Sequence, residues 1–473
     1  MRGDILVEPA GQRADRVYLS KRQRDSLGVD VGKELTISYE GKSREVKVVS
    51  AKEAHAKEKS KLRVSKNILG CLGIEEGADI TYNYEDGRLV ISPGVTVGVY
   101  APQTGTGDKP YRKQTTFFKE LTEEGRKIGV QVCVFAGKDY SAQGKTVDAQ
   151  FYDPETGRWA RKQIKMPEVV YDRGAGMTSA VHKAIQDAGT LLNPRELGLL
   201  VGDKQATHDA LHKKGVRYDT KVRQPETHSY SKKNLGKMID NHGTVFLKPR
   251  AGSQGTGIIR VKKLEDKFEV KYEDKTKHVK RGELHDTVDS AASEMTGRGV
   301  QSDYIVQQGI DLPEYNDAVF DVRVMLHKDE KGRWQRTSMM ARVGKKGRVN
   351  SNTSTGGSGV RLSKIISDLY GQGFSHGRQD TVANNVRQAA HSTAEAIEAH
   401  LGKPVGELGV DICLDREGNA YVIEANSKPG RGVKALDQEF RQKSVRSPLL
   451  YSRYLAKKMR KARRSRLMDE RAA

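Results

Sequence analysis

Three oxygen-bearing side chains, Asp411, Glu424 and Asn426, lie close together in an otherwise apolar stretch of the chain. The turn-like residues 415–419 separate them and predict a hairpin centred on residue 417 or 418. Such a hairpin places Asp411 opposite residues 423–425, and Glu424 and Asn426 share one face because they are two apart in an extended segment. Mg²⁺ prefers oxygen ligands, usually one or two carboxylates together with substrate phosphates. The three residues are therefore predicted metal ligands; the alternative for any one alone is an ordinary polar residue of a strand.

A glycine-rich loop follows an apolar segment that ends in Lys248. Glycines at positions 252, 255 and 257 would let backbone N–H groups approach phosphate oxygens, and the lysine would add a positive charge. The loop leads into a strand and is not followed by Gly-Lys-Ser/Thr, so it is not a Walker loop. The two interpretations are a phosphate-binding loop and a flexible hairpin tip.

Two arginines, Arg323 and Arg342, interrupt apolar segments that are predicted to be central strands. A charge in such a strand is costly unless it is paired or bound to a ligand. One interpretation is an internal ion pair of Arg323 with Asp321, or of Arg342 with a carboxylate. The other is stabilisation of a transferring phosphoryl group. The segment 304–310 is an apolar strand that runs into a polar turn, and it is either an adenine-binding edge or an ordinary strand end.

The elements around these residues follow from hydrophobic periodicity. Strands are predicted at residues 244–249, 258–262, 267–272, 303–308, 320–327, 334–343, 408–414 and 420–425, and a helix near 383–401. We expect a small β-rich domain over residues 1–94, an α/β unit over 95–200, a long remainder over 201–457 and a basic tail over 458–473. No repeat of 20–50 residues is expected. The stretch 350–359, rich in Gly, Ser and Asn, is interpreted as a loop or lid.

The chain of 473 residues carries a net charge of +22, which suggests anionic partners or substrates. The first hundred residues contain 17 Lys/Arg and 15 Asp/Glu, a net charge of +2, and residues 456–471 contain 8 and 2, a net charge of +6. This basic tail is interpreted as a solvated helix end. Three single cysteines, no long apolar run and a start without the apolar core of a signal peptide favour a reducing cytoplasm.

Taken in order, these motifs resemble the YheC/YheD-like proteins of the ATP-grasp superfamily, which are known as spore-coat-associated in spore-forming bacteria. The resemblance runs over most of the chain. Its specific motifs are FDVRVMLHKDEKGRWQRTSMMARVG, GELGVDICLDREGNAYVIEANSKPGR and SRYLAKK, and the match also includes VFLKPRAGSQGTGIIRV. It implies an α+β ATP-grasp fold, in which two α+β subdomains clasp ATP, over residues 201–457. An α/β pre-ATP-grasp unit and the small β-rich N-terminal domain would precede it.

The resemblance also implies a role for each matching residue. Lys204 and Lys248 match the nucleotide-binding lysines, Gly252, Ser253, Gly255, Thr256 and Gly257 the phosphate-covering loop, Gln307, Gln308, Gly309 and Ile310 the adenine hinge, Arg323 and Arg342 the basic residues near the γ-phosphate, and Asp411, Glu424 and Asn426 the metal ligands. Two positions depart from the family pattern. Thr256 stands where a basic residue is expected, and residues 174–176 replace the usual polar run.

The implied activity is an ADP-forming carboxylate–amine ligase that uses ATP and Mg²⁺, with Mn²⁺ as an alternative ion. A substrate carboxylate would form an acyl phosphate, and an amine would then displace phosphate to give an amide. Amino acids or peptides are the expected substrates, and the basic chain suggests an acidic carboxyl donor. Two alternatives are an ATP-binding structural protein of the spore-coat type and a DNA-binding protein. The second rests on residues 62–93, which resemble the swapped-hairpin fold of AbrB-type factors, but the low net charge of this region counts against it.

Overall fold

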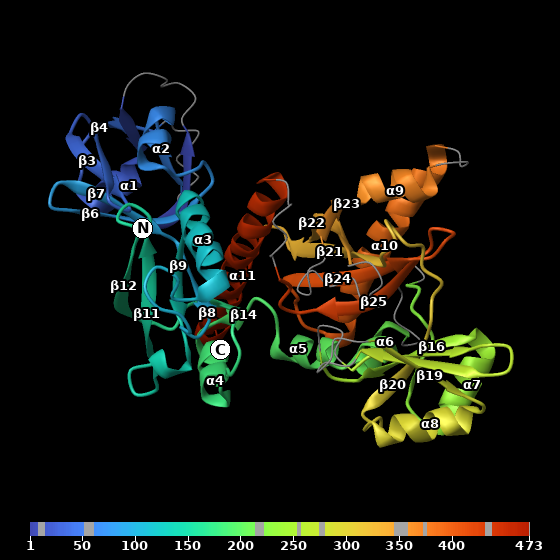
Figure 1. The fold of residues 1–473 in the computed structure, drawn as a ribbon. Coiled ribbons are helices and arrows are strands. Elements are labelled where there is room, and N and C mark those ends of the chain that lie inside the picture. The colour runs from blue at the N-terminus through green and yellow to red at the C-terminus, as the bar shows by residue number, and fades with distance from the viewer. Residues whose placement is uncertain are drawn as a thin grey trace. The chain divides into compact units, whose positions relative to one another are not determined.

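The chain divides into two compact units in the computed structural model (Figure 1). The structure describes residues 1–7, 15–51, 61–212, 222–252, 257–273, 280–344, 358–371, 376–430 and 438–472. One unit consists of residues 1–192, 329–332 and 445–473, and the other of residues 193–328 and 333–444. The finer domain boundaries expected near residues 94, 200 and 457 stay a prediction.

A closed barrel forms the N-terminal part of the first unit. Its strands follow the order β1-β5-β2-β4-β3-β7-β6. The elements are β1 (Arg2–Val7), β2 (Arg16–Leu19), α1 (Lys21–Leu27), β3 (Glu34–Tyr39), β4 (Lys42–Ser50), β5 (Lys61–Val64), α2 (Lys66–Leu72), β6 (Asp79–Glu85) and β7 (Arg88–Pro93). The expected β-rich domain is thus observed, including the hairpin at Asp86-Gly87.

The barrel contains one βαβ unit twice, as β2-α1-β3 and β5-α2-β6, which corrects the expectation that no repeat exists. Ser20 and Ser65 are the N-caps of α1 and α2, and Gly28 and Gly73 end these helices in left-handed conformations. Both pairs are 45 residues apart (65 − 20 and 73 − 28). The two copies pair with each other, since β2 is antiparallel to β5. At this 45-residue spacing eight of the 25 residues in 16–40 are identical to their counterparts in 61–85, so the repeat is also present in the sequence.

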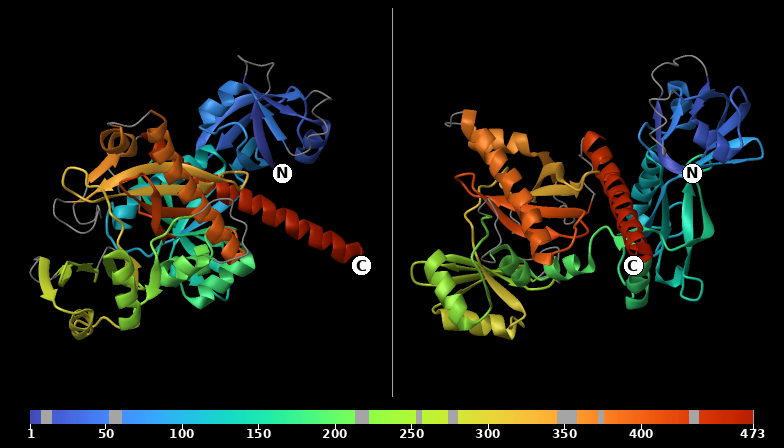
Figure 2. Two further views of the ribbon diagram at one scale, coloured as in Figure 1. Left: turned by 90° about the vertical axis from the view of Figure 1, so that its right-hand side faces the viewer. Right: turned by 180° about the vertical axis from the view of Figure 1, so that it is seen from behind.

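The rest of the first unit is an α/β sheet with the order β10-β11-β9-β8-β13-β14, in which β12 pairs with β11. The elements are β8 (Val95–Tyr100), α3 (Thr115–Lys127), β9 (Val130–Phe135), β10 (Tyr140–Ser141), β11 (Thr146–Asp153), β12 (Arg158–Lys165), β13 (Val169–Asp172), α4 (Ser179–Ala188) and β14 (Thr190–Leu191). The central strands β9, β8 and β13 are parallel and carry buried valines. The long helix α11 (Gln438–Ala472) packs Val445, Leu449 and Leu455 into this core (Figure 2).

The second unit contains two antiparallel sheets. The first has the order β15-β20-β16-β17-β18-β19, and α7 and α8 pack against it (Figure 1). Its elements, with the helices that precede it, are α5 (Arg195–Gly202), α6 (Lys204–His212), β15 (Thr227–Ser229), α7 (Lys232–His242), β16 (Thr244–Pro249), β17 (Ile259–Lys263), β18 (Phe268–Glu273), β19 (Lys280–His285), α8 (Val288–Gly297) and β20 (Tyr304–Gln308). The predicted strands of this region are confirmed to within a residue.

The second sheet of this unit has the order β23-β22-β21-β24-β25. Its elements are β21 (Phe320–Lys328), β22 (Trp334–Val343), β23 (Ser358–Arg361), α9 (Leu362–Tyr370), α10 (His376–Leu401), β24 (Glu407–Leu414) and β25 (Ala420–Asn426). The expected apolar face of α10, with Val386, Ala390 and Ile397, is buried against the sheet. Most of the stretch interpreted as a loop or lid lies outside the described residues.

Two further observations concern the whole described chain. None of its described helices combines the length and the apolar character that a bilayer span requires. All three cysteines are free thiols: Cys71 is exposed, Cys133 is buried and Cys413 is half-buried.

Candidate functional site

The hairpin of β24 and β25 places the three predicted metal ligands at neighbouring positions. Asp411 lies directly opposite Glu424, and Asn426 is paired with Gly409. The turn forms because Asp415 accepts hydrogen bonds from the backbone N–H groups of Glu417 (3.0 Å) and Asn419 (2.8 Å). The predicted register is therefore confirmed. A bulge between Asp411 and Ile412 re-aims the side chains at this point, as bulges near functional sites commonly do.

Asp411 is held by both arginines that the sequence singled out. Arg323 forms a two-point ion pair with it, and the second Asp411 oxygen also lies 3.0 Å from Nη2 of Arg342. Arg342 Nε in turn donates to Asp321 (2.6 Å), its cross-strand neighbour. Burial alone would raise the pKa of Asp411, but the two guanidinium groups lower it below the usual value. The expected pair of Arg342 with a carboxylate is thus confirmed, and Arg323 pairs with Asp411 where Asp321 was the expected partner. The role of the arginines near a γ-phosphate stays a prediction.

Glu424 is in a different electrostatic position. Its half-buried carboxylate makes no hydrogen bond or ion pair with any described residue. Burial raises its pKa, and the neighbouring negative charge of Asp411 adds to the rise. The positive charges of Lys204, Arg323 and Lys248 oppose the shift. Asp411 is therefore paired with two arginines, whereas the Glu424 carboxylate has no such partner among the described residues. Cationic side chains from both sheets of the second unit act on Glu424.

The two predicted nucleotide-binding lysines come from the other sheet and its flanking helix. Lys248, near the end of β16, donates to the side-chain oxygen of Gln307 at 2.6 Å, and burial lowers its pKa to about 8. Lys204, at the start of α6, donates to the carbonyl oxygens of Pro249 (3.1 Å) and Gly252 (3.0 Å). Burial lowers the pKa of Lys204 as well. Both ammonium groups are held next to the glycine-rich loop and both influence Glu424.

The glycine-rich loop is described only at its two ends. Gly252 has a φ of +121° and Gly257 a φ of +76°, conformations that favour glycine. A Cβ at Gly257 would lie 3.1 Å from Pro249 and from the hydroxyl group of Tyr304. The predicted loop residues Ser253, Gly255 and Thr256 lie outside the described residues.

The predicted adenine hinge lies at the end of β20, between β15 and β16. Gln307 is buried, and its side-chain amide donates to Thr227 at 3.0 Å. The backbone N–H of Gln308 donates to Glu226 (2.8 Å), and that of Gly309 donates to Thr244 (2.9 Å). Within the described chain, the N–H of Ile310 has no such acceptor and is left for a ligand or solvent.

The donor set of the hairpin fits a magnesium ion that is shared with phosphate oxygens. The described residues contain no group of three or more His, Cys, Asp or Glu side chains that could hold a metal alone. The hairpin supplies two carboxylates and one amide, and Mg²⁺ bound with nucleotide phosphates ordinarily uses one or two protein carboxylates. A divalent cation here would also relieve the charge repulsion between Glu424 and Asp411 that raises the pKa of Glu424.

Sequence reasoning missed residues that position the site from far along the chain. Asn193 accepts from the N–H groups of Gly406 and Glu407 and donates to the carbonyl groups of Glu407 and Ser427, so it ties the start of β24 to the end of β25. Asp203, just before Lys204, pairs with Arg250 at 2.7 Å. No local signal marks either residue, because an asparagine or aspartate beside a turn is common.

Comparisons with known proteins identify the family of the chain. The family described as YheC/D like ATP-grasp matches residues 197–455. The endospore coat-associated protein YheD of Bacillus subtilis (strain 168) is 24% identical over 351 residues, which cover 72% of this chain and 74% of YheD. The endospore coat-associated protein YheC of the same organism is 23% identical over 350 residues, 72% of this chain and 93% of YheC. Among solved structures, the VanG D-Ala:D-Ser ligase from Enterococcus faecalis matches with a TM-score of 0.43 and 12% identity, over 76% of this chain and 99% of that one. Since the family match covers more than half of the 473 residues, the chain belongs to the YheC/D-like ATP-grasp family.

Proposed function

We propose that this protein is an ATP- and Mg²⁺-dependent ligase that joins a carboxylate to an amine and releases ADP and phosphate. One observation carries the proposal: Lys204 of α6, Lys248 of β16 and Asp411 of β24 all lie close enough to the Glu424 carboxylate to act on it electrostatically. Two lysines beside a glycine-rich loop suit phosphate oxygens, and the adjacent carboxylates suit a hard cation. This is the pairing of charges that phosphoryl transfer needs.

In the proposed reaction, a carboxylate oxygen of the substrate attacks the γ-phosphorus of ATP, and the bond from that phosphorus to the β-phosphate oxygen breaks. The products of this step are ADP and an acyl phosphate. An amine nitrogen then attacks the acyl carbon, phosphate leaves, and the nitrogen loses a proton to solvent. Mg²⁺ would supply charge neutralisation at the phosphates.

The residues of the chain have electrostatic and positioning roles in this proposal. Lys204 and Lys248 would exchange their present protein acceptors for phosphate oxygens, and Asp411, Glu424 and Asn426 would hold the ion. Arg323 and Arg342 keep Asp411 ionised. A protein nucleophile is not needed, and burial raises the pKa of the nearby Cys413 thiol to about 12, which keeps it protonated at neutral pH.

The proposal is tested by ADP release from purified protein with ATP, Mg²⁺ and pools of amino acids and peptides. Glu424→Gln is expected to reduce turnover by about 10²-fold or more, because it removes a charge from the cation site. Glu265→Gln makes the same chemical change at an exposed loop position and should leave turnover unchanged. Full turnover in Glu424→Gln would contradict the metal assignment.

The rival function is a non-catalytic ATP-binding protein of the spore-coat type. The relatives YheD and YheC are both named as endospore coat-associated proteins, which supports this rival. It predicts nucleotide binding by the wild-type protein without ADP release for any carboxylate and amine. A DNA-binding role of the barrel is a weaker rival, and tight binding of the full chain to duplex DNA at moderate salt would favour it.

A further inference from the structure

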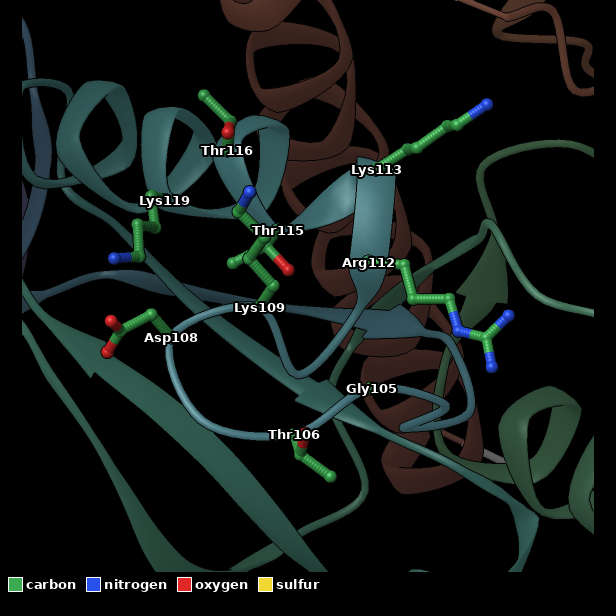
Figure 3. A pocket seen from close by; sticks show the side chains of 9 residues that line it. All are labelled: Gly105, Thr106, Asp108, Lys109, Arg112, Lys113, Thr115, Thr116 and Lys119. Atoms are coloured by element: carbon green, nitrogen blue, oxygen red, sulfur yellow. The ribbon is translucent and has the colours of Figure 1, made fainter.

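A hollow of about 660 Å³ opens beside the start of α3 in the first unit (Figure 3). The loop between β8 and α3 forms most of its lining, and the first turns of α3 supply the rest. The lining residues are Gly105, Thr106, Asp108, Lys109, Arg112, Lys113, Thr115, Thr116 and Lys119. None of them belongs to the proposed nucleotide site, which lies in the second unit.

The loop owes its shape to main-chain hydrogen bonds. The N–H groups of Thr104 and Gly105 donate to the carbonyl of Pro110, and the N–H of Arg112 donates to the carbonyl of Lys109. Gly105 is required for this shape, because a Cβ there would lie 2.1 Å from the Lys109 carbonyl oxygen. The loop is therefore shaped mainly by its main chain, and Arg112 adds one side-chain hydrogen bond from Nε to the Thr104 carbonyl.

The charged side chains of the hollow are available to a ligand. Lys109, Arg112 and Lys113 are exposed, and none of them forms an ion pair with a residue that the structure describes. Arg112 Nε donates a hydrogen bond to the Thr104 carbonyl (2.8 Å). The Lys119 ammonium lies 4.7 Å from the centre of the Tyr152 ring. The hollow therefore carries four cationic side chains against one carboxylate.

The spacing of the cationic side chains suits several separate charges. The N–H groups of Thr104, Gly105, Lys109 and Arg112 donate to loop carbonyls, and that of Tyr111 donates to the Thr115 hydroxyl group. The N–H groups of Thr106, Gly107 and Asp108 donate to no residue that the structure describes, so competition with inorganic triphosphate is one arm of the test below. Figure 3 also shows the long side chains spread out, with Lys109 and Lys119 toward one side of the loop and Arg112 and Lys113 toward the other. Point charges on flexible stems can follow an extended chain of carboxylates.

From these observations we propose that the hollow binds a short acidic peptide segment with several carboxylates. Binding itself does not depend on the ligase activity.

The test is fluorescence anisotropy of a labelled, terminally blocked tetraglutamate peptide with the full chain, without ATP, at low salt. The double variant Lys109→Gln/Lys113→Gln is expected to weaken binding about tenfold or more. Two lysines are replaced together because a single exposed ion pair contributes little to affinity. Gly105→Ala should also weaken binding, since it displaces the loop without changing charge. The control Lys21→Gln/Lys66→Gln makes the same charge change at the first residues of α1 and α2 and should bind like wild type.

Three results would overturn the proposal: no peptide binding by the wild-type protein, equal weakening in the control pair, or inorganic triphosphate that competes at lower concentration than the peptide. A blocked tetraglutamine peptide should not bind. ADP release separates this inference from the ligase proposal. Turnover of other carboxylates without peptide binding would refute only the proposal that the hollow binds an acidic peptide. Peptide binding without turnover of any carboxylate would refute only the proposal that the protein is a ligase.

Discussion

At the residue scale, the candidate site contains two carboxylates that lie opposite each other in one hairpin but differ in their electrostatic surroundings. Asp411 is satisfied by two arginines and is kept ionised, whereas Glu424 has no hydrogen-bonding partner among the described residues and has a raised pKa. Lys248 completes this picture, because burial lowers its pKa to about 8. A bound cation would stabilise the carboxylate whose pKa is raised, and a bound anion would stabilise the ammonium group whose pKa is lowered. A metal ion and a polyphosphate carry these charges.

Lys248 makes ATP affinity depend on pH in a range where ordinary lysines do not titrate. The ammonium is charged below about pH 8 and becomes neutral above it, while an unperturbed lysine stays charged to about pH 10.4. Bound phosphate would favour the charged form, so ATP binding is expected to weaken by up to about tenfold per pH unit as the pH rises above 8. Titration calorimetry at pH 7, 8 and 9 measures this.

Two variants show whether Lys248 causes the slope. Lys248→Met should bind weakly and with no slope above pH 8. Lys262→Met, which changes an exposed lysine on β17, should keep the wild-type slope. Constant wild-type affinity from pH 7 to 9, or a slope that survives in Lys248→Met, would contradict this account.

At the element scale, helix α11 connects the barrel to the α/β sheet through arginines at seven-residue spacing. Arg446 pairs with Glu75 of the barrel and with Glu124 of α3. Arg453 donates to the carbonyls of Gly77 (3.2 Å) and Ile128 (3.3 Å). Arg460 pairs with Glu168 and donates to the Gly94 carbonyl (2.9 Å). Since Arg460 belongs to the basic tail, the view of this tail as a fully solvated helix end is corrected at this residue, while residues 461–466 are exposed as expected.

Loss of these arginines should loosen the barrel locally. Arg446→Gln/Arg453→Gln is expected to lower stability by about 1–2 kcal/mol, a small value because the pairs are partly exposed. Hydrogen exchange followed by mass spectrometry should show faster exchange in residues 74–80. Lys461→Gln/Arg464→Gln makes the same charge change on the exposed part of α11 and should not alter exchange there. Equal exchange in both pairs would show that α11 does not hold the barrel.

Some helices and strands around the site could be predicted from the sequence, and others could not. The hairpin of β24 and β25 was predictable because alternation and turn residues are local signals, and its register brought Asp411 opposite Glu424 as expected. Helices α5 to α9 were not predicted; each is only 8 to 11 residues long, although α9 buries Leu362, Ile365 and Ile366 at helical spacing. The partners of the site residues, such as Gln307 for Lys248, depend on strand pairings that no local pattern determines.

At the scale of the whole molecule, the chain combines two separately built units. One unit carries the barrel, the α/β sheet and the basic hollow, and the other carries the two sheets with the nucleotide and metal candidates. The fold was predictable because several long motifs occur in the order of one family, and family membership is now shown. The repeat inside the barrel was missed, although its caps and eight of the 25 residues in 16–40 recur 45 residues later.

The central claim is that ATP activates a carboxylate, and oxygen transfer tests it most directly. The protein is incubated in unlabelled water with ATP, Mg²⁺, unlabelled amines and ¹⁸O-carboxyl-labelled amino acids and glutamate-rich peptides. Because the attacking carboxylate oxygen stays on the phosphorus when the amine displaces phosphate, the released phosphate should gain one ¹⁸O per turnover, detected by mass spectrometry. ADP release with unlabelled phosphate would mean that water is the acceptor, and it would contradict carboxylate activation.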